Sequence, residues 1–304
     1  MFKRKSIWLI TAAAAFAASP LHAQEQKGAA PTALADADPA VWVVKDDDTT
    51  IYLFGTFHLL DGKQDWFNDE VKTAFDRSDE VVLEAKMPED PAELQPLIVR
   101  YAVDPSGKTL TSKLPAATAS KLGEALKELG APAAALDMFE PWFASLTLTV
   151  LKAQSRGLQA EHGTEAVITK AAKASNKPVG ELEGFEYQLK LFDGMPEKQQ
   201  IAYLGQSLDQ LSKVDEQLSN MVGAWAKGDA DGIAKLMNDG LSESPELSDL
   251  LLARRNANWA AWIDDRLDKP GTVFVAVGAG HLAGDKSVQK LLAARGIATT
   301  RVQN

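Results

Sequence analysis

Two histidines in this chain end short apolar segments that are typical of buried β-strands. His58 follows the apolar residues 51–54 and Gly55, and His281 follows the apolar residues 272–277 and two further glycines. A glycine at the end of a strand lets the backbone turn or approach another group closely. Because ligand sites of open α/β folds lie at the carboxyl edge of the sheet, both imidazoles are predicted to reach such an edge.

A carboxylate ends a third apolar segment, residues 80–84, at Glu84. Two imidazoles and a carboxylate form a standard ligand set for a divalent transition metal, with a further position open to water. Such an ion lowers the pKa of its bound water to about 7. Each residue alone is more simply explained as a structural group at a strand end, but together His58, Glu84 and His281 predict a site for Mn, Co or Zn.

Other residues are weaker candidates for the same site. Glu183 ends a short apolar segment and would serve as a further metal ligand or general base, or as a solvated acid. Arg255 and Asn256 lie in a helical segment and would bind a substrate oxygen, or form an ordinary polar helix face. His162 is a third histidine for which a structural role is the simpler interpretation.

Composition restricts the partners of the chain. Its 304 residues are 45% hydrophobic and 24% charged, as in ordinary globular proteins, and the net charge is −10. An acidic chain is a poor partner for nucleic acid and for anionic membrane surfaces. There is no cysteine, which excludes disulfides and a thiol nucleophile.

The first 23 residues have the pattern of a secretory signal peptide. Three basic residues at positions 3–5 precede an apolar stretch at 7–18, and Leu21-His22-Ala23 resembles a cleavage site with the small Ala23 as its last residue. The mature chain is therefore expected in the periplasm or the medium, with no stable membrane insertion. Residues 24–39, rich in Ala, Asp, Gly and Pro, are expected to form a flexible leader.

The remaining residues, 40–304, are predicted to form a single α/β domain of the mixed α+β kind. Strand patterns occur near both ends, as a hairpin over 41–54 and as segments 80–84, 273–277 and 298–302, while helical patterns dominate from about 91 to 267. Short strands are also predicted at 159–161 and 177–183. The two ends must therefore meet in one central mixed sheet that helices surround.

These motifs together resemble the TraB/GumN family, which includes the TIKI proteins, and the secreted GumN-type bacterial members in particular. The resemblance covers about residues 42–302 and is carried by Tyr52–His58, Leu83-Glu84, Pro141-Trp142, Leu182-Glu183 with Gln188, Arg255-Asn256 with Trp259, and Val277–Leu282.

The resemblance implies both a fold and a chemistry. TIKI members are metal-dependent proteases with two Gly-x-x-His motifs and an essential acid, which would correspond here to His58, His281 and Glu84. The family is similar in fold to erythromycin esterases and ChaN-like proteins, and its pattern also places Arg255, Asn256 and Glu183 along the site. Family members usually carry Gly-x-Asp where this chain has Gly163-Thr164-Glu165, which leaves the role of Glu165 open.

Three functions follow as hypotheses. The first is a metal-dependent hydrolase, expected to be a peptidase, whose bound water attacks a carbonyl with Glu183 or Glu84 as proton acceptor. The second is a metal-free, esterase-like hydrolase in which His58 acts as general base and Glu84 orients it. The third is a non-catalytic binding protein that assists polysaccharide assembly or the cell envelope.

Overall fold

The computed structural model describes residues 34–88, 90–241 and 245–303, which form two compact units. The sheet unit holds the described residues up to 87 together with 156–191 and 213–303, and the helical unit holds 88–155 and 192–212. The predicted signal peptide and most of the predicted leader lie outside the described residues. The prediction of a single domain stays a prediction, and each unit is described by itself.

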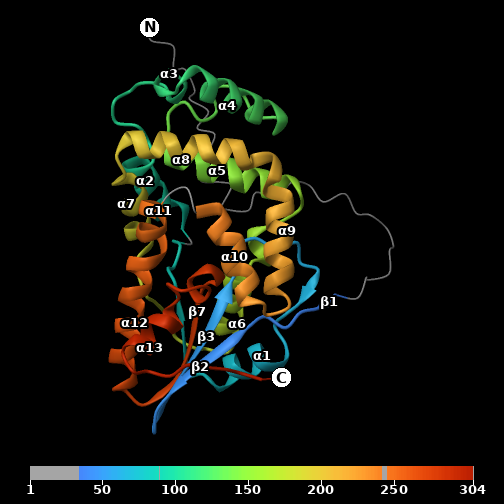
Figure 1. The fold of residues 1–304 in the computed structure, drawn as a ribbon, viewed down its shortest axis with the longest axis vertical. Helices are drawn as coiled ribbons and strands as arrows, with labels where there is room; N and C mark the ends of the chain where they lie inside the picture. Colours follow the sequence, from blue (N-terminus) through green and yellow to red (C-terminus); the bar gives the residue numbers. More distant parts are fainter. Residues whose placement is uncertain (1–33, 89, 242–244, 304) are drawn as a thin grey trace. The chain divides into compact units, whose positions relative to one another are not determined.

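A mixed six-stranded sheet forms the centre of the sheet unit, in the order β6-β5-β7-β3-β2-β8 (Figure 1). The strands are β2 Val41–Lys45, β3 Thr49–Thr56, β5 Glu80–Leu83, β6 Val179–Glu181, β7 Gly271–Gly278 and β8 Thr300–Arg301. β3 and β7 pair in parallel over eight residues, from Thr49 with Gly271 to Thr56 with Gly278. The prediction that the two ends of the chain share one mixed sheet is therefore confirmed.

Both faces of this sheet are buried. One face carries aromatic residues that pack together, with the rings of Phe54 and Trp66 stacked at 5.5 Å and those of Phe54 and Phe274 at 5.7 Å. The opposite face carries smaller apolar side chains such as Leu53 and Val275. Because successive side chains of a strand point to opposite faces, the continuous apolar runs of β3 and β7 fill both cores at once.

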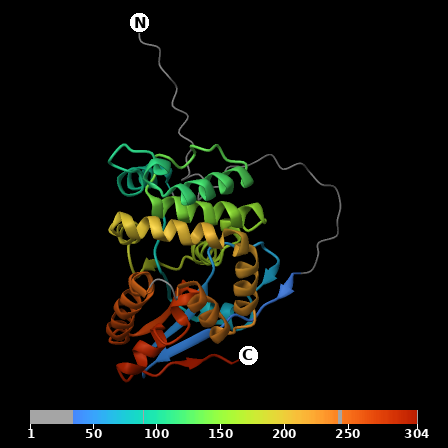
Figure 2. The same ribbon diagram turned by 45° about the horizontal axis from the view of Figure 1, so that its top comes forward.

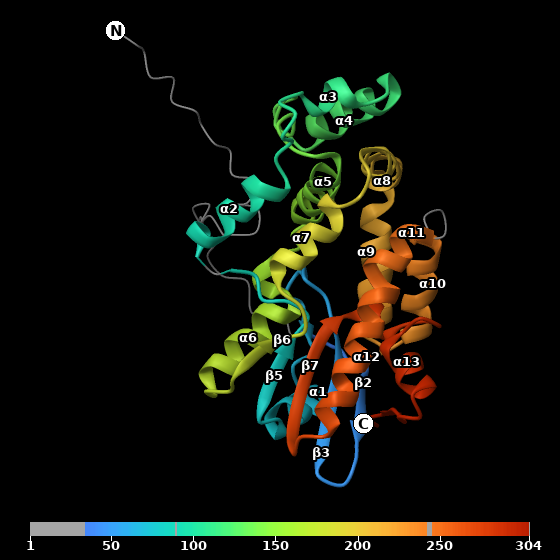
Figure 3. The same cartoon turned by 90° about the vertical axis from the view of Figure 1, so that its left-hand side faces the viewer.

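Helices cover each face. α1 Asp69–Arg77, α6 Thr164–Ala174, α9 Val214–Trp225 and α10 Ala230–Leu241 contribute buried residues to the aromatic core. α12 Arg254–Leu267 and α13 Val288–Ala294 contribute to the opposite core (Figure 3). The result is a three-layer arrangement in which helices cover both faces of the sheet. A site is therefore expected at the ends of the strands and not on a face of the sheet.

Short elements complete the sheet unit. They are the parallel pair β1 Ala35–Asp36 and β4 Gln64–Asp65, the 3₁₀ turns Ala160–His162 and Ala279–Leu282, helix α11 Pro245–Ser248, the π-helical turn Asp249–Ala253, and most of α7 Phe185–Asp193. A predicted strand at 159–161 is wrong. Gln159 makes only an isolated bridge with Leu60, because the chain turns at once and His162 N–H donates back to the Gln159 carbonyl at 3.3 Å.

The helical unit consists of α2 Pro91–Tyr101, α3 Leu110–Lys113, α4 Ala116–Glu128, α5 Pro141–Ser155 and α8 Glu197–Gln210. α5 and α8 run side by side (Figure 2), joined by a hydrogen bond of 2.6 Å between Ser145 and Ser207. A 3₁₀ turn at Leu211–Lys213 follows α8 and precedes α9 along the chain. Among the described residues, no helix combines the length and the apolar character that crossing a membrane requires.

Candidate functional site

Four parallel strands bring the predicted site residues to one edge of the sheet. β3, β7, β5 and β6 pair in parallel, so their carboxyl ends lie together. His58 lies two residues beyond β3, Glu84 directly follows β5, Glu183 lies two residues beyond β6, and His281 lies in the turn after β7. The prediction that distant strands would deliver these side chains to a shared edge therefore agrees with the topology.

Arg255 lies at the centre of this edge. Its Nε donates to the Glu183 carboxylate at 2.8 Å, and its Nη2 pairs with both Glu183 and Glu84. Its Nη1 donates to the Leu251 carbonyl at 2.9 Å and lies 3.2 Å from His281 Nε2. All three guanidinium nitrogens thus have acceptors, as a rigid fork of donors allows.

The two carboxylates have further donors. Gln188 Nε2 donates to Glu84 and to Glu183, at 2.9 Å in each case, and the Gly278 amide donates to Glu84 Oε2 at 2.9 Å. Burial alone would raise the pKa of Glu84, but the charges of Arg255 and His58 and the Gly278 amide stabilise the carboxylate, and this pKa is lowered to about 2. Glu84 is therefore an ionised, fully hydrogen-bonded group.

His281 is held as a neutral imidazole. Its Nδ1 lies 2.6 Å from Asn256 Oδ1, and Asn256 in turn donates through Nδ2 to the Lys286 carbonyl at 2.7 Å. Because Oδ1 can only accept, Nδ1 carries the proton and Nε2 accepts from Arg255. Burial lowers the pKa of His281 to about 3, and the ring packs on Trp259 with centroids 4.3 Å apart.

His58 has a different environment. Its side chain is 72% exposed, and its Nδ1 lies 2.8 Å from the carboxylate of Glu165 in the first turn of α6. The Glu165 carboxylate raises the pKa of His58 to about 9. The charge of Glu84 also raises the pKa of His58, and the charge of Arg255 lowers it. The partner of His58 is therefore Glu165, whose role the sequence left open, and not Glu84 as the esterase-like hypothesis expected.

The predicted metal ligands do not form a compact donor set. Among the described residues, groups of three His, Asp or Glu donor atoms within 4.8 Å of one another include none of His58, Glu84 and His281. Instead, the permanently charged Arg255 pairs with the Glu84 carboxylate and faces His281 Nε2. A metal ion at this place would need the same carboxylate and the same ring nitrogen as ligands. This arrangement does not fit a three-ligand metal site, and the site for Mn, Co or Zn stays a prediction.

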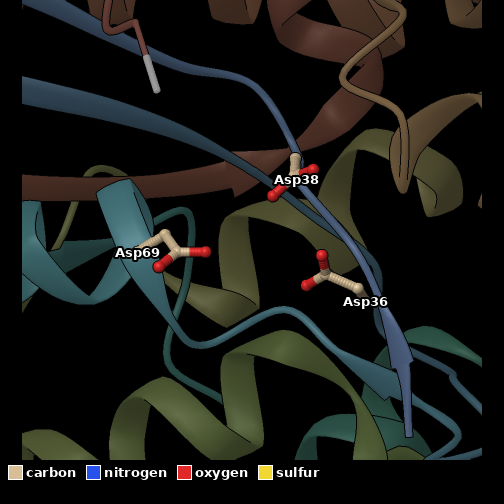
Figure 4. A group of neighbouring side chains, drawn as sticks. All are labelled: Asp36, Asp38 and Asp69. Atoms are coloured by element: carbon tan, nitrogen blue, oxygen red, sulfur yellow. The ribbon is translucent and has the colours of Figure 1, made fainter.

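A group of three acids elsewhere in the sheet unit has its carboxylate oxygens within 4.8 Å of one another. The carboxylates of Asp36, Asp38 and Asp69 lie within 4.8 Å of one another and point toward a common region (Figure 4). Asp36 and Asp69 are exposed, so water can solvate their charges without an ion. We assign no function to this group.

Arg255, Asn256 and Glu183 are all engaged with other groups of the protein. Arg255 and Asn256 are 6% and 1% exposed, and each is engaged with protein groups, so their binding of a substrate oxygen stays a prediction. Glu183 is likewise held by Arg255 and Gln188. The His162 ring lies apart from this network, against Gly62.

Two site residues were missed as candidates. Glu165 was noted only as a departure from a family pattern, and Gln188 only as part of a motif. The available signal was position, since Glu165 lies in the first turn of a helix whose N-cap is Gly163.

Comparison with known proteins agrees with these motifs. A family model described as TraB/PrgY/gumN matches residues 40–301. The chain belongs to the TraB/PrgY/gumN family. It is 25% identical over 254 residues to "Uncharacterized protein YbaP" of Escherichia coli strain K12, covering 84% of this chain and 92% of that protein. The protein of the same name from Shigella flexneri is 29% identical over 192 residues, covering 63% and 71%. No solved structure gives a significant match.

The buried ion pairs of Arg255 with Glu84 and Glu183 can be tested by substitution. Replacing Arg255 with Met should lower the free energy of unfolding by about 3–5 kcal/mol, because two buried carboxylates lose their counter-ion. Equilibrium unfolding in urea, followed by circular dichroism, measures this change.

The neighbouring Arg254 provides a matched control. It pairs with Asp249 on the surface, where its side chain is 69% exposed, so Arg254→Met should cost less than about 1 kcal/mol. Equal effects of the two substitutions would show that the central guanidinium does not hold the carboxylates.

Proposed function

We propose that this member of the TraB/PrgY/gumN family is a hydrolase in which His58 activates water for attack on a carbonyl. The observation that carries the proposal is the contact of 2.8 Å between His58 Nδ1 and Glu165, on a ring whose other side faces solvent. A carboxylate on one nitrogen and open space at the other is the arrangement that general-base catalysis needs.

In the proposed reaction, the Glu165 carboxylate, 2.8 Å from Nδ1, keeps the proton on that nitrogen. The lone pair of the other ring nitrogen, Nε2, is then directed toward water. Nε2 takes a proton from the water as the oxygen attacks the carbonyl carbon, and the imidazolium then returns the proton to the leaving group. Glu165 stabilises the imidazolium that forms in between. This step is the second of the three functional hypotheses, with Glu165 in the place expected for Glu84.

The Arg255 network supports this step from one side. It keeps Glu84 ionised, and burial keeps His281 neutral, so these two groups do not change their charge over the pH range in which His58 titrates. Peptides remain the proposed natural substrates by analogy with the family, and activated esters are the most sensitive probes because their leaving groups need little protonation.

We also propose that the protein acts in the periplasm or the medium. The basic, apolar and small-residue segments of the first 23 residues support export. A cleavage position after Ala23 would be checked by the amino-terminal sequence of the protein recovered from a periplasmic extract.

The proposed role of His58 as general base leads to a prediction for its substitution. His58→Ala should reduce hydrolysis of p-nitrophenyl acetate and of fluorescein-labelled casein at least about 100-fold, the usual contribution of a general base. His162→Ala, which changes a histidine outside the network, should keep the rate of the unchanged protein.

Treatment with 1,10-phenanthroline followed by gel filtration separates this proposal from the metal-dependent hypothesis. The proposed reaction keeps its rate in the chelated protein. Loss of the rate on chelation, with recovery when Mn²⁺ or Zn²⁺ is added, would contradict the proposal and favour the metal-dependent hydrolase. Absence of hydrolysis of both substrates would favour a binding protein.

A second prediction follows from the pKa of His58. Because Glu165 raises this pKa to about 9, the base form of His58 increases about tenfold per pH unit below that value, and kcat/KM should rise with pH up to about 9. Glu165→Gln removes the charge that raises the pKa, so the rise should end at lower pH, near the ordinary histidine value of about 6.5.

Glu161→Gln is the control for this profile, since Glu161 is an exposed acid of the same segment. Its profile should match that of the unchanged protein. A profile of the unchanged protein that is already flat from pH 7 upward would contradict the role given to Glu165.

A further inference from the structure

Two hydrogen bonds join the segment that carries Glu165 to the loop that carries His58. The Thr164 amide donates to the Phe57 carbonyl at 2.9 Å, and the Phe57 amide donates to Thr164 Oγ1 at 2.9 Å. Phe57 directly precedes His58, and Thr164 directly precedes Glu165. His58 and Glu165 therefore each follow directly a residue that takes part in the hydrogen bonds between the two segments.

The hydroxyl of Thr164 has a second connection. As a donor it has two acceptors at 3.3 Å, the Phe57 carbonyl and Oε2 of Glu165 itself. One hydroxyl thus accepts from the loop of His58 while it can donate to the carboxylate that contacts His58. Thr164 is completely buried, so water does not compete for these bonds.

Gly163 allows this close approach. A Cβ atom at Gly163 would lie 2.1 Å from the carbonyl oxygen of His58, a distance at which the backbone would have to shift. The start of α6 therefore contacts the His58 loop through two consecutive residues, Gly163 and Thr164. A contact this close transmits small displacements of one segment to the other.

We propose that Thr164 is the positioning residue of the site, whose hydroxyl holds the Glu165 carboxylate against the His58 imidazole. The inference rests on the proposed function for its kinetic consequence, but the geometry it describes can be measured without any substrate. A merely structural Thr164 would satisfy the Phe57 amide and affect stability, and would leave the His58–Glu165 contact unchanged.

The test uses the mature chain with ¹⁵N-labelled histidine. In the unchanged protein, the proton on His58 Nδ1 should give a separate downfield resonance, because it is bonded to a carboxylate; His58→Ala assigns that resonance. Thr164→Val keeps the shape of the side chain but removes its hydroxyl, and should abolish the resonance or move it upfield. Thr164→Ser, which keeps the hydroxyl, should restore it.

Kinetics with p-nitrophenyl acetate provide the second readout. Thr164→Val should lower kcat by about 10- to 100-fold, as small misplacements of catalytic groups do, with little change in KM. Thr164→Ser should recover most of the loss. Thr73→Val, at an exposed position of α1, controls for the loss of a threonine hydroxyl elsewhere.

The outcomes separate the two proposals. If Thr164→Val keeps both the resonance and the rate, the positioning role is overturned even where Glu165→Gln confirms the proposed function. If the resonance responds as expected but the unchanged protein hydrolyses neither probe, the positioning role holds and the proposed function fails. Should Thr164→Val not fold, Thr164→Ala, which also removes the hydroxyl, decides in its place, with loss of the resonance expected and its retention contradicting the inference.

Discussion

The guanidinium of Arg255 is the interaction on which the edge of the sheet depends. Two carboxylates, Glu84 and Glu183, follow adjacent parallel strands and would repel each other in a buried environment. Arg255 bonds both of them and also bonds the imidazole of His281. Removing one member of such a buried network leaves the others without a counter-charge, so the network has to be assembled as a unit.

This constraint divides the edge into two parts with different properties. The buried part around Arg255 contains two carboxyl side chains and a neutral histidine, and its side chains are engaged with one another. The exposed part contains His58, which is oriented by Glu165 from a separate helix. A rigid, charged support beside an accessible titratable group is a common arrangement for catalysis, because the support needs no reorganisation during the reaction.

Much of the sheet could be predicted from the sequence, because its signals are local. The apolar runs of β3 and β7, each ended by glycine, identified the strands and the edge that they share. Which side chain contacts which could not be predicted in this way. Arg255 is distant in sequence from Glu84, and Glu165 from His58, and no periodicity reports such contacts. The residue types suggested a ligand set for a metal, which stays a prediction; the pairing of Arg255 with Glu84 and Glu183 could not be read from them.

The central claim is that the guanidinium of Arg255 neutralises the two carboxylates. A crystal structure of the mature protein grown with Mn²⁺, with anomalous differences measured near the manganese edge, tests it most directly. The account predicts that Arg255 contacts Glu84 and Glu183 and that no anomalous peak lies within bonding distance of His58, Glu84 or His281. A manganese peak bonded to those three side chains, with Arg255 turned away from Glu84, would contradict it.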